Sequence, residues 1–164
     1  MKKQTPNPNA LSKEGALPRQ RPLSPEDRIV DVAKILADLR NPRFAEFPFW
    51  EALVDQVEDH LNSDTPLDEA LTAVAIVDRM LGHMRANFVS ELKFYDPKDV
   101  EIAGGQGISG FDWLGRQTLR LQIGLSAQNP KECAFALLQM GEGLDILQAS
   151  FRQVKALSEA EPRH

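Results

Sequence analysis

The stretch TPLDEALTAVAIVDRMLGHMRANFVSELKFY, residues 65–95, decides the fold class because a helical pattern runs through it with no proline after Pro66. At about 100° per residue its apolar residues fall on one broad face. These residues are Leu67, Ala70, Leu71, Val74, Val77, Leu81, Met84, Phe88, Leu92 and Tyr95. Thr65 is the expected N-cap and Pro66 the first helical residue. The stretch therefore predicts one long amphipathic helix.

Two charged residues, Asp78 and Arg85, lie near the centre of that apolar face. They are seven residues apart, so their side-chain bases are separated by about 10 Å and do not pair easily within one helix. Because a charge in a core needs a partner, we expect each to meet another helix. Asp145 and Arg152 have the same spacing near the end of the chain. In antiparallel helices, Asp78 would meet Arg152 and Arg85 would meet Asp145, which gives a predicted buried charge network with an intersubunit contact as the alternative.

Four further segments have helical patterns, so the expected fold is an all-α bundle of about five helices. The segments are residues 24–40, 48–62, 111–127 and 130–158. The last one has a heptad seam. Its members are Cys133, Leu137, Met140, Leu144, Leu147, Phe151 and Val154. Helices three and five are thus the expected two long antiparallel spine helices, while residues 117–126 also alternate with a strand-like period of two.

Composition bounds the class of protein. The chain has 164 residues, 42% of them hydrophobic and 26% charged, which fits a single helical domain over residues 24–160. A net charge of −5 disfavours a general nucleic-acid binder. The single Cys133 excludes an internal disulfide framework and favours a cytoplasmic setting. The sequence has no secretory h-region and no apolar run long enough to span a membrane.

Both ends of the chain are expected to lie outside that domain. Residues 1–23 contain four prolines and few apolar residues, which is typical of a disordered tail. The tail holds five basic residues against one acid, so its net charge is +4 and that of the remainder is −9. A solvated tail is the simplest interpretation, and a basic arm that reaches an acidic partner is the alternative. Residues 161–164 are expected to fray, and Ser24 to cap the first helix.

Four aromatic residues cluster around the expected start of the second helix. Phe44, Phe47, Phe49 and Trp50 are four of the chain's eleven aromatic residues. At a hinge their rings would plug the end of a bundle, whereas exposed rings would anchor a partner. Both interpretations stay open, so these four are candidate partner-binding residues.

A glycine cluster follows at residues 104–110. Gly105, Gly107 and Gly110 match the spacing G-x-G-x-x-G of dinucleotide-binding loops. That fingerprint belongs in a βαβ unit, and the preceding residues have helical rather than strand patterns. We therefore expect a flexible crossover loop, with a recognition loop or a nucleotide-binding loop as alternatives.

Catalytic and metal-binding patterns are weak. His83 has no carboxylate at the spacing of a Glu-x-x-His site, and His60 belongs to one acidic cluster without a matching second. Cys133 lies on an apolar seam, and Ser109 is not in a G-x-S-x-G turn. We predict no metal, no cofactor and no catalytic residue, so an enzyme is disfavoured.

The sequence therefore favours a small soluble, non-catalytic helical protein that acts by protein–protein interaction as an adaptor, inhibitor or accessory subunit. A homodimer is expected because the heptad seam could serve two chains. The alternative is a small-ligand or nucleotide-binding protein that uses residues 104–110. Neither the partner nor the pathway can be read from these residues.

Overall fold

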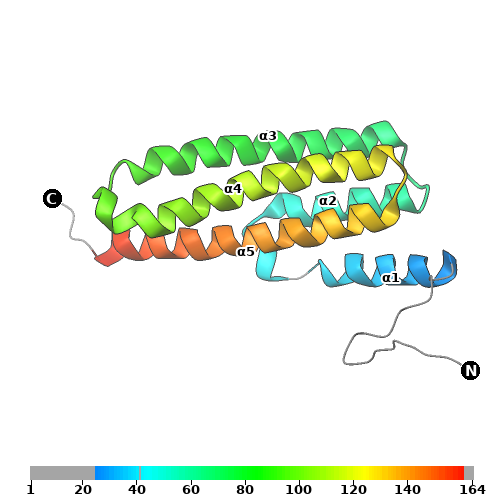
Figure 1. Cartoon of the computed structure of the whole chain (residues 1–164), viewed down its shortest axis with the longest axis horizontal. Coiled ribbons are helices and arrows are strands. Elements are labelled where there is room, and N and C mark those ends of the chain that lie inside the picture. The colour runs from blue at the N-terminus through cyan, green and yellow to red at the C-terminus, as the bar shows by residue number, and fades with distance from the viewer. Residues whose placement is uncertain (1–24, 41, 161–164) are drawn as a thin grey trace, which may run out of the picture.

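The protein is a bundle of five α-helices, shown in Figure 1 as a computed structural model that describes residues 25–40 and 42–160. Residues 25–31 and 43 are described by their backbone alone. The helices are α1 (Pro25–Asp38), α2 (Pro48–Leu61), α3 (Leu67–Leu92), α4 (Pro97–Ser126) and α5 (Pro130–Ala160), with a 3-10 turn η1 (Pro42–Phe44) before α2. The predicted all-α class and the number of helices are confirmed. The predicted tail 1–23, the cap at Ser24 and the fraying at 161–164 concern residues outside these ranges.

Three long helices run through the bundle, and each is antiparallel to the next (Figure 1). Turns of only a few residues join α3 to α4 and α4 to α5, so α3 and α5 run parallel to each other. The long antiparallel pairs are therefore α3 with α4 and α4 with α5. Long antiparallel helices were predicted and are present, but the antiparallel partner of α3 is α4 rather than the expected fifth helix, and α4 begins fourteen residues earlier than expected.

The start of α4 explains that difference. Pro97 occupies the first turn, where its missing N–H does no harm, and the Asp96 carboxylate accepts a hydrogen bond of 2.9 Å from the Lys98 backbone N–H. The helix then continues for 30 residues through the glycine cluster. Residues 117–126 lie inside α4, so their helical interpretation is correct and the strand-like alternation is not used.

The predicted apolar faces of α3 and α5 both contribute to the core. On α3, five of the ten expected residues are buried and the other five pack against the core. All seven seam residues of α5 belong to the same cluster or pack against it. The expected Thr65 cap is wrong, because α3 begins at Leu67 and no side chain caps its N-terminus.

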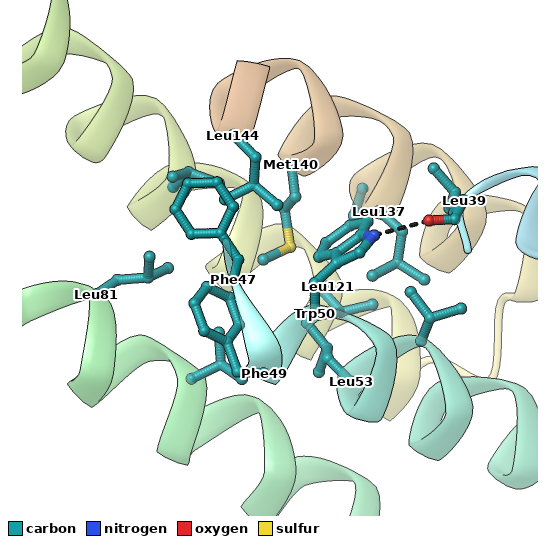
Figure 2. Packing of buried hydrophobic residues seen from close by; sticks show 14 of the residues in the cluster. Leu39, Phe47, Phe49, Trp50, Leu53, Leu81, Leu121, Leu137, Met140 and Leu144 are labelled. Carbon is teal, nitrogen blue, oxygen red and sulfur yellow. Dashed lines mark hydrogen bonds between the residues drawn. The ribbon is translucent and has the colours of Figure 1, made fainter. Parts of the chain in front are cut away.

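Helix α2 lies beside α3 and α5 over only part of their length (Figure 1). In Figure 2 the rings of Phe47, just before α2, and of Phe49 lie between α3 and α5, whereas the Trp50 indole points toward Leu39. Helix α1 packs against α5 and α2, and the Trp50 Nε1–H donates a 2.8 Å hydrogen bond to the Leu39 carbonyl. We call this part of the bundle the covered half. The part beyond Phe47, where α3, α4 and α5 continue without α2, is the open half.

The glycines of residues 104–110 are helical, so the expected loop is wrong. Gly107 faces α3 and α5, and a Cβ there would lie 2.5 Å from the Phe88 ring and 2.6 Å from Ser150 Oγ. A Cβ at Gly104 would lie 2.9 Å from Leu92 Cδ1. These distances are shorter than real carbon contacts, so the missing side chains let α4 pack closely against its neighbours. Gly105 is different, because it is exposed and has open space around its Cα.

Candidate functional site

The four aromatic residues that were candidate partner anchors lie in the core. Phe44, Phe47, Phe49 and Trp50 are between 2% and 9% exposed. Phe44 and Trp50 pack edge to face with ring centroids 5.6 Å apart. Such burial fits rings that plug the bundle and does not fit rings displayed to a partner.

The candidate glycines have separate environments. Gly110 is buried, and its Cβ position lies 3.1 Å from Ile146 Cγ2 and 3.1 Å from Leu147 Cδ2. Gly107 is equally buried, so Gly105 is the only one of the three that is open to solvent. A helical backbone offers no free N–H groups to cradle a phosphate. The alternative of a nucleotide-binding loop therefore has no structural support, because residues 104–110 form part of a helix.

The predicted charge network is not assembled as expected. Because α3 and α5 are parallel, the antiparallel premise that joined Asp78 to Arg152 fails, and both of these residues are exposed. The Arg85 Nε–H instead donates to Asp112 of α4 at 3.2 Å, across a half-exposed surface. Asp145 is half-buried.

The open half contains a channel between α3 and α5. Its lining residues are Met84, Asn87, Phe88 and Glu91 of α3 and Phe151, Val154, Lys155 and Ser158 of α5. Its volume is about 390 Å³. Phe47, next to the first residue of α2, has its ring centroid 6.5 Å from that of Phe151. The channel therefore begins next to the N-terminus of α2, and we call it the open channel.

The floor of the open channel is a cluster of aromatic rings. Phe88 and Phe151 have ring centroids 5.4 Å apart, and Phe111 of α4 lies behind both at 6.0 and 6.1 Å. Gly107 lets the Phe88 ring approach α4 this closely. The floor is thus rigid, apolar and supported by all three long helices.

The rims of the open channel are polar. Asn87 and Glu91 are exposed on the α3 side, and Lys155 is exposed on the α5 side. Phe151 at the floor is half-buried, so part of its ring faces the channel. An apolar floor between opposite charges suits an amphipathic segment.

The cysteine is part of the core. Burial raises the pKa of the Cys133 thiol to about 12, with a smaller contribution from the Glu132 charge. A thiol in this state is not a nucleophile at neutral pH.

Metal-ligand clusters are also missing from the part of the chain that the structure describes, where no three His, Cys, Asp or Glu side chains gather. Within those same residues no helix is both long enough and apolar enough to cross a membrane. Comparison with protein families, curated proteins and solved structures found no match to this chain.

The open channel was not predicted from the sequence, although Met84, Phe88, Phe151 and Val154 were on the expected apolar faces. The sequence did contain one signal for the channel, which is the difference in length between the second and third predicted helices. The second helix was expected to begin at Pro48 and run for about four turns, while the third was expected to be about twice as long. A short helix packed against long ones leaves part of their apolar faces uncovered.

Proposed function

We propose that this chain is a non-catalytic interaction protein, an adaptor, inhibitor or accessory subunit, whose open channel binds a helix of another protein. One observation carries the proposal. In the covered half, α2 fills the space between α3 and α5 that is left open as the channel in the other half (Figures 1 and 2). The chain itself provides the example of how that space accepts a helix. Docking of an amphipathic helix into an apolar groove is a common mode of protein recognition.

The shape of the open channel favours a helix over a small ligand. Its floor continues in line with α2 and its two long sides carry Asn87, Glu91 and Lys155 rather than a closing lid. Small-molecule sites bury most of their ligand in a cleft with a few convergent polar groups. Here the polar residues stand apart on opposite rims, which fits the polar flanks of a docked helix.

Cross-linking in the native host tests the proposal. A photo-cross-linking amino acid is placed at Lys155 on the channel rim and, as the control, at Leu119, which is 57% exposed on α4. We expect position 155 to capture a segment of one other protein, with apolar residues at helical spacing. A cross-link to another copy of this chain would instead indicate that the channel is a homodimer interface, and it would overturn the proposal.

Affinity measurements then locate the captured segment. It is synthesised as a peptide and titrated against the wild-type protein, Asn87→Trp and Ala86→Trp. The indole of Asn87→Trp would obstruct the open channel, whereas Ala86 is the exposed neighbour that does not line it. We expect Asn87→Trp to weaken Kd by about tenfold or more, equivalent to about 1.4 kcal/mol, with Ala86→Trp unchanged. Equal Kd values for both variants would contradict the proposal.

A further inference from the structure

We infer that the partner segment is an amphipathic helix of about three turns that lies in the open channel parallel to α2, with a basic edge toward α3 and an acidic edge toward α5. This inference rests on the proposed function and adds the length, direction and charge pattern of the bound segment. Each of these three properties follows from a separate feature of the channel.

The length follows from the residues that line the two sides. The lining spans residues 84–91 on α3 and 151–158 on α5. Eight helical residues extend about 12 Å, and a partner of about three turns, roughly 16 Å long, covers this length from end to end. Its apolar anchors at i, i+3 or i+4, and i+7 would lie over Phe88, Phe151 and Val154.

The direction follows from the arrangement of the bundle. Helix α2 is antiparallel to both α3 and α5, as α4 is on the other side of them (Figure 1). A partner with the same direction as α2 keeps neighbouring helix dipoles opposed. Its C-terminal carbonyls would then face the N-terminus of α2, where Phe47 provides no side-chain cap.

The charge pattern follows from the rims. Glu91 lies on the α3 side, one residue before the end of its helix, and Lys155 lies on the α5 side, more than one turn before the end of its helix. Rim charges of this kind contribute little affinity but select orientation and partner. If the same helix were inserted in the reverse direction, it would present its basic edge to Lys155 and its acidic edge to Glu91, so the rim charges hold a helix with these edges in the direction that the dipoles favour.

Paramagnetic labelling of a defined probe tests the direction. The probe is a peptide of about 14 residues, selected from displayed amphipathic helices for binding to the wild-type protein and not to Asn87→Trp. A nitroxide at its C-terminus is expected to broaden the amide resonances of Phe49 and Trp50. A nitroxide at its N-terminus is expected to broaden those of Lys93 and Ser158.

The outcomes separate the two levels of the proposal. Exchanged broadening patterns would overturn the inferred direction and leave the helix-binding function standing. Failure of every peptide to distinguish wild type from Asn87→Trp would overturn both. For the charge pattern, Lys155→Glu should weaken binding a few-fold, while Lys131→Glu, the same change in the first turn of α5, should have no effect. Equal effects of the two substitutions would overturn the charge assignment.

Discussion

The covered and open halves of the bundle are built on the same three helices and differ in what fills the space between α3 and α5. In the covered half Phe47 and the α2 residues Phe49 and Trp50 are buried in this space, and α1 packs outside α2 and α5. In the open half no α2 residue fills this space, and apolar residues of α3 and α5 form the floor of a channel. Helix length, rather than a special residue, therefore creates the candidate site, because α2 has 14 residues and α3 has 26.

Removing a ring from the covered half should have the largest effect. Trp50→Ala deletes a side chain that is 2% exposed together with its hydrogen bond to Leu39. We expect the free energy of unfolding to fall by about 3–5 kcal/mol in urea denaturation. Met84→Ala in the open channel should lower it by less than about 2 kcal/mol, because Met84 is only half-buried. Equal losses would show that the two halves are equally closed.

Alanine at two neighbouring glycines should have opposite effects. Gly107→Ala places a methyl group against Phe88 and Ser150, so we expect a loss of about 1–3 kcal/mol from overpacking. Gly105→Ala meets open space and removes a helix-breaking residue, so we expect a gain of up to about 1 kcal/mol. Thermal and urea unfolding of the two variants check this. A loss at Gly105 would contradict the helical course of residues 104–110.

The pH dependence of stability should report on Cys133 in the covered half. Its pKa is raised from 9.0 to about 12 in the folded protein. As the pH rises from about 9 to 12, the unfolded chain loses this proton first, so stability falls by at most about 1.4 kcal/mol per pH unit. Cys133→Ala should show a smaller decline across the same range in urea titrations. Parallel curves for the two proteins would mean that the thiol is not buried as described.

Charge pairs on the surface should have the smallest effects. A double-mutant cycle at Arg85 and Asp112 should give a coupling of about 0.2–1 kcal/mol, because the pair is half-exposed. A cycle that reverses Asp78 and Arg152 should give no coupling, since both are exposed on parallel helices. Restored stability in that second double reversal would support the network expected from the sequence instead.

The sequence predicted the elements whose signals are local. The ten apolar residues expected on the third helix, nine of which lie in α3, and the seven of the α5 seam all belong to the core or pack against it. These predictions succeeded because helical periodicity is written within one segment. The start of α2 at Pro48 was predicted for the same reason.

The sequence misled where the decisive contact comes from another segment. Each of the four glycines in residues 104–110 costs about 1 kcal/mol relative to alanine in a helix, and only that local cost is visible in the sequence. The compensating close approach to Phe88 and Leu92 comes from α3 and cannot be seen in α4 itself. Gly104, Gly107 and Gly110 are nevertheless in helical phase with Phe111 and Leu114, a signal that could have identified the helix.

The open channel could not be predicted for a related reason. It joins residues 84–91 to residues 151–158, and its boundary is set by the position of Phe47. The matched spacing of Asp78, Arg85, Asp145 and Arg152 suggested a different neighbour for the same helices. Which of these charges can meet depends on the order of the helices around the bundle, and spacing along the chain does not specify that order.

Methionine-methyl NMR tests the central claim most directly, because the chain carries reporters in both halves. Met84 lines the open channel, whereas Met140 is fully buried in the covered half. During titration with the cross-linked partner peptide, we predict that the Met84 methyl resonance moves and that the Met140 resonance stays in place. A stationary Met84 resonance at saturating peptide would contradict binding in the open channel.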